Sequence, residues 1–210
     1  MKRCLLAILL LLLPGTTAFC AEDAFGPPLD NRNEAAFAKV IHSLKIRHPL
    51  TVSFVQEKQI AALGRPLVSS GVMHIAQGGV CWLTEKPLRS AMSLSPEGIA
   101  HRSAGGSTEF RSAEDHAEIR YFSKIMMALF LARREVLEDE FHVFFKKGAN
   151  GWQIGLRPDR RMVAKLLKGI LIEGDEKVSR VTILEANGDR TAISFEPANH
   201  RQMTLADCVP

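Results

Sequence analysis

The chain has 210 residues, of which 46% are hydrophobic and 24% are charged, and its formal net charge is +4. These values are ordinary for a globular protein of one domain. Two of the positive charges, on Lys2 and Arg3, lie in the N-terminal segment described next. The small positive balance that is left argues against nucleic acid as a partner.

The first twenty residues have the layout of a secretory signal. Lys2 and Arg3 precede an apolar run from Leu5 to Leu13, and the small residues Ala18 and Cys20 stand where signal peptidase reads its substrate. The apolar run is about ten residues long, short of the length that crosses a bilayer as a helix. We therefore expect cleavage after Cys20 and export to the periplasm.

An alternative makes Cys20 the lipidated first residue of a lipoprotein, but the bulky Phe19 stands where such a signal needs a small residue. Downstream of the signal the sequence shows no periodicity until residue 33, and it is rich in Pro, Asp, Asn and Gly. We predict a signal peptide at 1–20, a flexible lead-in at 21–33, a single domain at 34–200 and a C-terminal tail at 201–210.

Helical and strand periods alternate along the predicted domain. From Asn33, a suitable cap, apolar residues recur at helical spacing as far as Leu44. From Leu50 to Gln56 the period changes to two, as in a strand with one dry face. Further strands are predicted at 67–75, 79–84, 90–95 and 98–102, and, after a helix at 117–133, at 140–146, 151–157, 170–174, 178–185 and 191–195.

The short spacing of the strands allows only hairpins and meanders, so the sheet is predicted to be antiparallel. Asn187-Gly188 is a strong hairpin signal between the last two strands. Residues 159–168 are predicted to form one or two helical turns, with an extended segment as the alternative. About ten strands with two or three helices indicate an α+β domain dominated by one large sheet, which must curl.

Motifs of catalysis and of metal binding are absent from the sequence. It has no G-x-S-x-G, H-E-x-x-H, C-x-x-C or P-loop motif, and its seven histidines are scattered. The Gly-rich stretch 103–107 indicates a hairpin loop that could act as a flap. The charged stretches 138–140 and 157–161 are predicted to be solvated turns, the second with a chance of touching a partner or a lipid headgroup. We predict no enzyme, no cofactor and no metal, and we keep a hydrolase as a third alternative.

Cys81 and Cys208 are the two cysteines that certainly remain after export. In an oxidising compartment such a pair can form a disulfide, which here would tie down the C-terminal tail. The alternative is two unpaired cysteines, one buried in a strand and one in a loose tail.

Several motifs follow one another between about residues 36 and 196. They are Val52-Ser53-Phe54-Val55-Gln56 after the first helix, Ser70-Gly71-Val72-Met73-His74-Ile75 leading to Trp82 and Pro87, Leu129-Phe130-Leu131 followed by Leu137 and Phe141, Trp152-x-Ile154-x-Leu156-x-Pro158, and the alternating run from Val181 to Phe195. No single motif is specific, but their order and spacing together resemble the LolA family of periplasmic lipoprotein carriers.

The resemblance implies an incomplete antiparallel barrel whose apolar concave face is capped by helices. It also implies a cargo of acyl chains that passes from an inner-membrane ABC transporter to an outer-membrane acceptor, with only transient membrane contact. We expect a monomer in which the helices around 37–44 and 122–131 act as lids. Strand alternation and the adaptable methionines predict a lipid-binding set: Val52, Phe54, Val72, Trp82, Met92, Leu94, Phe122, Met126 and Phe130.

One stretch departs from the family pattern. Typical carriers of this type have an Arg-Pro pair just before the strand that ends in the tryptophan, and this arginine is thought to fasten the lid. Here the stretch is Ala76-Gln77-Gly78-Gly79, and Gln77 carries no charge. Two alternatives therefore stay open: a specialised relative that moves a different lipid-linked product, and a sensor or assembly partner whose interior is filled by its own side chains.

Overall fold

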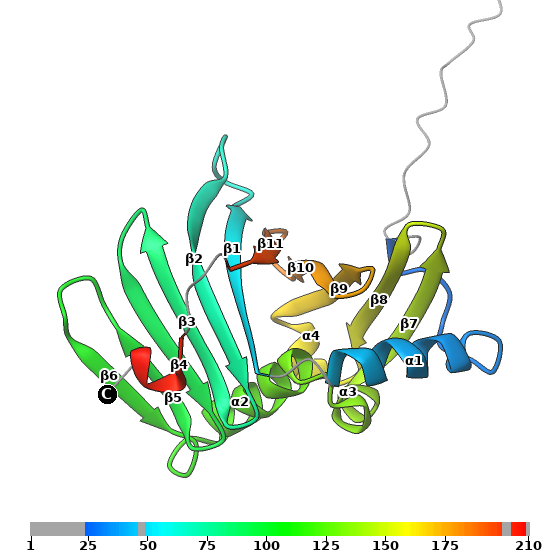
Figure 1. Ribbon diagram of the computed structural model, residues 1–210, viewed down its shortest axis with the longest axis horizontal. Helices are drawn as coiled ribbons and strands as arrows, with labels where there is room; N and C mark the ends of the chain where they lie inside the picture. Colours follow the sequence, from blue (N-terminus) through cyan, green and yellow to red (C-terminus); the bar gives the residue numbers. More distant parts are fainter. Residues whose placement is uncertain (1–23, 46–48, 199–202, 209–210) are drawn as a thin grey trace, which may run out of the picture.

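A single antiparallel sheet dominates the computed structural model, which describes residues 24–45, 49–198 and 203–208. Its eleven strands lie in the order β6-β5-β4-β3-β2-β1-β11-β10-β9-β8-β7, and β6 and β7 at its two ends do not pair with each other. Figure 1 shows the sheet bent into an open trough with helices along one side. The predicted α+β class and incomplete barrel are confirmed. The predicted signal peptide and its cleavage site lie outside the described residues.

The strands and helices alternate along the chain much as the sequence periods predict. The strands are β1 (Leu50–Gln59), β2 (Leu67–Ala76), β3 (Gly79–Lys86), β4 (Ser90–Ser95), β5 (Gly98–Arg102), β6 (Thr108–Ser112), β7 (Phe141–Gly148), β8 (Gly151–Pro158), β9 (Leu167–Gly174), β10 (Val178–Glu185) and β11 (Arg190–Pro197). The helices are α1 (Glu34–Lys45), α2 (Ala117–Phe130), α3 (Arg134–Glu140), α4 (Arg161–Ala164) and the short 3-10 helix η2 (Leu205–Asp207).

Two details differ from the sequence prediction. Strand β6 was not predicted, because its sequence TEFRS has one large apolar residue and shows no alternation; that residue, Phe110, is 60% exposed. The single helix predicted at 117–133 is two helices, since Ala132 adopts a left-handed conformation with φ of 48° between α2 and α3.

Two apolar cores lie on the concave side of the sheet. The first core joins α1, α2 and α3 to β7, β8 and β9 through side chains that include Phe37, Ile125, Leu137, Phe145 and Ile154. The second core joins α2 to β1, β2, β3, β4 and β11 through side chains that include Val52, Phe54, Met73, Met127 and Ile193. Helix α2 therefore contributes to both cores and bridges the two halves of the sheet.

The N-terminal strap, residues 24–29, packs on the outer side of β8 and β9 and along β7. Phe25 is only 5% exposed, and Gly169 makes room for its ring, since a Cβ at Gly169 would lie 2.4 Å from Phe25 Cζ. The amide of Phe145 donates a hydrogen bond of 3.0 Å to the carbonyl of Pro27, and that of Leu29 one of 2.9 Å to Val143. A flexible lead-in thus does not describe this stretch, because its one large aromatic residue is anchored.

The C-terminal tail, residues 203–208, covers the outer side of β2, β3 and β4. Met203 and Cys208 pack there with Val72, Leu83 and Ala91. A disulfide joins Cys81 of β3 to Cys208, so the predicted bond is confirmed.

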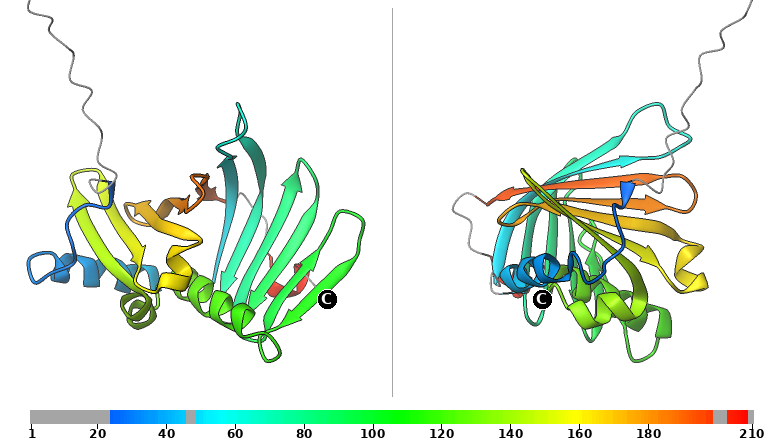
Figure 2. Two further views of the ribbon diagram at one scale, coloured as in Figure 1. Left: turned by 180° about the vertical axis from the view of Figure 1, so that it is seen from behind. Right: turned by 90° about the vertical axis from the view of Figure 1, so that its right-hand side faces the viewer.

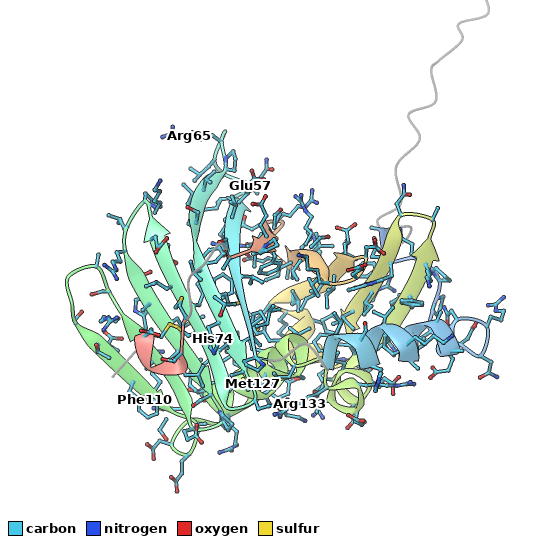
Figure 3. All side chains as sticks on the ribbon, viewed as in Figure 1. Glu57, Arg65, His74, Phe110, Met127 and Arg133 are labelled. Atoms are coloured by element: carbon cyan, nitrogen blue, oxygen red, sulfur yellow. A yellow bond between two sulfur atoms is a disulfide. The ribbon has the colours of Figure 1, made fainter. Side chains whose placement is uncertain are left out.

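Views from other sides show the same division into a sheet and a row of helices (Figure 2). The hairpin of β1 and β2 rises above its neighbours, with Arg65 near its tip, while Phe110 marks the edge strand β6 and Met127 lies on α2 (Figure 3).

Candidate functional site

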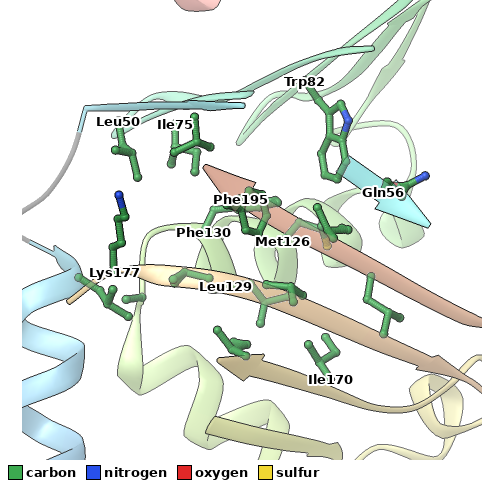
Figure 4. A pocket seen from close by; sticks show the side chains of 18 of the residues that line it. Leu50, Gln56, Ile75, Trp82, Met126, Leu129, Phe130, Ile170, Lys177 and Phe195 are labelled. Atoms are coloured by element: carbon green, nitrogen blue, oxygen red, sulfur yellow. The ribbon is translucent and has the colours of Figure 1, made fainter. Parts of the chain in front are cut away.

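An apolar cavity of about 250 Å³ lies between the two cores, beneath α2 and against the inner face of the sheet. Strands β1, β9, β10 and β11 form most of its wall, and Figure 4 shows their side chains converging on it. It is lined by Leu44, Leu50, Val52, Gln56, Ile75, Trp82, Met126, Leu129, Phe130, Ala132, Ile170, Ile172, Lys177, Val178, Val181, Ile183, Thr191, Ile193 and Phe195.

The strand part of this wall follows from the alternation of side chains across a sheet. In the pairing of β9 with β10, Ile172 lies opposite Val181 and Ile170 opposite Ile183, so these four branched side chains share one face. A register shift between Val178 and Arg180 changes the alternation at the start of β10. Val178 therefore lines the cavity together with Val181, although the two are an odd number of residues apart.

The helical part of the wall comes from α1 and α2. Leu44 near the end of α1 and Met126, Leu129 and Phe130 of α2 line the cavity. The ring of Trp82 on β3 lies edge-on to Phe130, with 6.3 Å between the ring centroids. This aromatic pair joins the sheet to the end of α2.

The structure distributes the predicted lipid-binding residues over five environments. Val52, Trp82, Met126 and Phe130 line the cavity. Phe54 and Leu94 lie in the second core beside it, and the Phe54 ring is 5.0 Å from that of Trp82. Met92 pairs with Trp82 across β3 and β4 on the concave face but is half-buried outside the cavity.

Two of the predicted residues do not face the cavity. Val72 lies on the outer side of the sheet with Cys81 and Met203, and its neighbour Met73 faces inward opposite Val52. The choice of Val72 was wrong by one residue, and a slip of one residue reverses every side chain of a strand. Phe122 lies on the outer side of α2 and is 46% exposed.

The larger part of the cavity wall was not among the predicted residues. It belongs to β9, β10 and β11, from which Ile170, Ile183 and Ile193 project inward. Their alternation was visible in the sequence. What the sequence did not reveal is that β11 pairs with β1, which brings the last three strands beside the first.

The two ends of the cavity differ in charge. At the end formed by Gln56 and Thr191, the nearby Lys58 is paired with Glu185 at 3.0 Å, and Thr191 Oγ1 donates to the same carboxylate at 3.3 Å. At the other end, Lys177 is the only charged side chain among the described residues that line the cavity.

Glu140, at the end of α3, is 1% exposed although the sequence predicted a solvated turn. Tyr121 Oη and Arg160 Nε donate to its Oε2 at 2.7 and 2.6 Å, and Lys124 Nζ donates to its Oε1 at 2.7 Å. Because Tyr121 and Lys124 lie on α2, one buried carboxylate fastens this helix to the junction of α3 and β7.

The charge of Glu140 is maintained by its partners. Burial alone would raise the pKa of this carboxyl, but the hydrogen bonds from Lys124 and Tyr121, together with the charge of Lys124, hold its pKa below the ordinary value. Burial and the hydrogen bond to Glu140 raise the pKa of Tyr121 to about 12, so its hydroxyl stays protonated and donates.

Gln77, which stands where the resemblance places an arginine, is exposed in the turn between β2 and β3. A second attachment of the helices lies elsewhere. Arg134 of α3 pairs with Glu34 of α1 and with Glu138, and its guanidinium carbon lies 5.2 Å from the centroid of the Phe37 ring. Both helix attachments are therefore on the β7 side of the cavity.

Within residues 24–45, 49–198 and 203–208, no three His, Cys, Asp or Glu side chains are placed to share a metal ion. In the same ranges no helix combines the length and the apolar composition that crossing a membrane requires.

No protein-family model matches the sequence, and no curated protein matches it. Solved structures similar to this chain include a LolA superfamily protein from Nitrosomonas europaea, with a TM-score of 0.44, 9% identity and coverage of 82% of this chain and 97% of the other. A DUF1329 family protein from Desulfovibrio piger has a TM-score of 0.41 and 8% identity over 78% of this chain and 90% of the other. A putative outer membrane lipoprotein-sorting protein domain from Vibrio parahaemolyticus has a TM-score of 0.39 and 7% identity over 75% and 89%.

Proposed function

We propose that this protein is a carrier that binds an acyl chain of a lipid or a lipoprotein in the apolar cavity between its two cores. The observation that carries the proposal is the cavity of about 250 Å³, whose wall is almost entirely hydrocarbon. A filled interior, which a sensor or assembly partner of this shape would have, leaves no room for such a chain. The cavity therefore favours the carrier over that alternative.

Shielding a hydrocarbon chain from water is what such a wall can do. Burial of one methylene is worth about 0.8 kcal/mol, so a long chain gains several kcal/mol from an apolar cavity and cannot cross water unshielded. The half-buried side chains of Met126 and Phe130 can shift to fit chains of different shape.

Loading requires the cavity to widen. Its volume of about 250 Å³ is slightly below the roughly 300–1,000 Å³ of typical ligand sites. Helix α2 is suited to move, because Phe130 with Trp82 is its one aromatic pair with β3 among the described residues, and this pair can separate without breaking a strand pair. We assign to α2 the role of the main lid.

The secretory signal in the sequence supports a periplasmic location for this carrier. There it would take its cargo from an inner-membrane ABC transporter and deliver it to an outer-membrane acceptor, as the family resemblance implies. A specialised carrier of another lipid-linked product would use the same cavity. Gln77 stands where the resemblance places the arginine that fastens the lid, but here α2 is fastened through Glu140 instead. The absence of that arginine therefore does not distinguish a lipoprotein cargo from another lipid-linked product.

Filling the cavity tests the proposal. Ile183 is half-buried and lines the cavity on β10, so Ile183→Trp would occupy the space with little strain on the cores. Val55→Trp is the matched control, because Val55 is 46% exposed on the other face of β1. Native mass spectrometry after incubation with hexadecanoic acid and a palmitoyl phospholipid would measure the bound lipid.

We expect the wild-type protein and Val55→Trp to retain a lipid. Ile183→Trp should bind at least about tenfold more weakly, the loss expected when about two methylenes are no longer buried. If none of the three proteins retains an acyl chain, the carrier function is wrong. If Ile183→Trp binds as well as the wild type, the chain lies elsewhere on the molecule.

A further inference from the structure

Lys177 has an unusual position at the end of the apolar cavity. It belongs to the turn between β9 and β10, and Figure 4 shows its side chain reaching toward Leu50, at the end of the cavity opposite Gln56 and Trp82. Among the described residues that line the cavity, it is the only one with a charge. An ammonium group in such a place needs an anion or water as its partner.

Asp175 and Glu176 lie in the same turn but form no ion pair with Lys177. Lys177 is exposed and has no ion-pair partner within the described residues, whereas Lys58 near the other end is paired with Glu185 at 3.0 Å. The turn that carries Lys177 is held in place, because Trp152 Nε1 donates a hydrogen bond of 2.6 Å to the carbonyl of Asp175. The backbone of this turn is therefore held against β8.

A second, open hollow of about 930 Å³ begins at the same residue. It lies between the turn of β7 and β8 and the turn of β9 and β10, and Lys177 lines both this hollow and the apolar cavity. Four cationic and three anionic side chains line the open hollow: Lys146, Lys147, Lys177, Arg180, Glu173, Asp175 and Glu176. An apolar cavity thus adjoins an open, charged hollow, and Lys177 lines both of them.

We infer that the cargo is an amphiphile with a hydrocarbon tail and an anionic head, a carboxylate or a phosphate, that binds the ammonium of Lys177. This inference rests on the proposed carrier function and names the class of its ligand. The tail lies in the cavity, where it is shielded, and the head stays in the open hollow, because burial of an unpaired charge is costly. A head with a neutral ester would leave the ammonium of Lys177 with water as its only partner.

The length of the cavity agrees with a tail that begins at Lys177. From Leu50 to Gln56 the cavity follows six residues of β1, a path of about 20 Å at the usual rise of a strand. An acyl chain occupies half of the bilayer core, about 15 Å. A tail anchored at Lys177 can therefore reach the neighbourhood of Trp82 without leaving the cavity.

Three probes with the same tail distinguish the contribution of the head to the affinity from that of the tail: dodecanoate, dodecyl phosphate and the neutral dodecanol. A change in the intensity or emission maximum of tryptophan fluorescence would report their binding to the full chain, because Trp82 lines the cavity and Trp152 lines the open hollow with Lys177. Lys177→Gln removes the charge but keeps a polar side chain of similar reach. Lys147→Gln is the matched control, since Lys147 lines the open hollow but not the cavity.

We expect the wild type to bind at least one of the two anions about fivefold more tightly than dodecanol, as a solvent-accessible charge pair provides. Lys177→Gln should abolish this preference with dodecanol unchanged, and Lys147→Gln should keep it. Comparison of the two anions tells a carboxylate head from a phosphate head.

Equal affinity of the wild type for all three probes would overturn the inference and leave the carrier function standing. So would a preference that survives in Lys177→Gln. Absence of binding by all three probes would overturn the carrier function itself, and the inference with it.

Discussion

The two ends of the sheet are built differently. At the β7 end the N-terminal strap pairs with the edge strand and buries Phe25, which is 5% exposed, while α1 covers the inner side. At the β6 end the edge strand is open, and Phe110, the only aromatic residue of β6, is 60% exposed. The same kind of side chain is an anchor at one end and a surface residue at the other.

This difference shows how an open sheet can hold a cavity. The β7 end is covered on both faces, and it also holds Glu140 and Arg134, which fasten α2 and α1. The β3–β6 end meets α2 mainly through apolar contacts of the second core. We therefore expect the β7 end to act as a fixed frame and the contact between α2 and β3 to be the place where the cavity opens.

Removal of the buried Phe25 ring should have the largest effect on stability. Phe25→Ala should lower the free energy of unfolding by about 3 kcal/mol or more, because it leaves a hole against Gly155 and Gly169. Phe110→Ala, the matched change at the open end, should cost about 0.5 kcal/mol or less. Urea unfolding followed by circular dichroism measures both, and equal losses would contradict the division into a fixed and an open end.

The disulfide is the next largest contribution, and it acts on the outer side of β2, β3 and β4. Replacement of both cysteines, Cys81→Ser with Cys208→Ser, should lower the free energy of unfolding by about 2–4 kcal/mol, since the bond closes a long loop. Hydrogen exchange should rise in β3 and β4 and stay unchanged in β8 and β9. An increase in β8 and β9 of the same size would contradict the independence of the two ends.

The buried carboxylate is expected to contribute less. Glu140→Gln keeps the shape of the side chain but removes the charge that Lys124 and Arg160 face, and we expect a loss of about 2 kcal/mol. Glu138→Gln in the same helix is the control, because this exposed residue should cost about 0.5 kcal/mol. Hydrogen exchange of α2 should increase in Glu140→Gln only; protection equal to that of the wild type would contradict the role of Glu140 as a fastening.

The same residue predicts a modest dependence on pH. The pKa of Glu140 is lower in the folded protein than its ordinary value of 4.5, so its contribution is present at pH values above 4.5 and is lost as the pH falls below it. The difference in unfolding free energy between the wild type and Glu140→Gln should therefore be constant near neutral pH and shrink in acid. If this difference in unfolding free energy grows as the pH falls, the lowered pKa of Glu140 in the folded protein is contradicted.

The sequence predicted most strands because their signal is local. The exact bounds of β4, β5 and β10 follow from alternation and turn residues, and the hairpin at Asn187-Gly188 is present, with φ of 94° at Gly188. Strand β6 has no such alternation, and the register of β2, which decides between Val72 and Met73, depends on its pairing with β1. Local patterns therefore predict elements better than they predict which face of an element is buried.

The candidate site depends more strongly on contacts that are distant in sequence. Strand alternation and the adaptable apolar side chains predicted Trp82, Met126 and Phe130, but the pairing of β1 with β11 determines that the last strands complete the wall. Burial of Glu140 likewise depends on Tyr121, Lys124 and Arg160, each at least 16 residues away. A run of three acidic residues contains no sign of these partners.

The most direct test of the central claim is to locate a bound acyl chain. Nuclear Overhauser contacts between ¹³C-labelled hexadecanoate and the methyl groups of the protein would do so. We expect contacts from the chain to Ile170, Ile172, Val181 and Ile193, which line the cavity, and none to Val72 on the outer side. Contacts to Val72 without contacts to these four residues would contradict a carrier whose cargo lies inside the curved sheet.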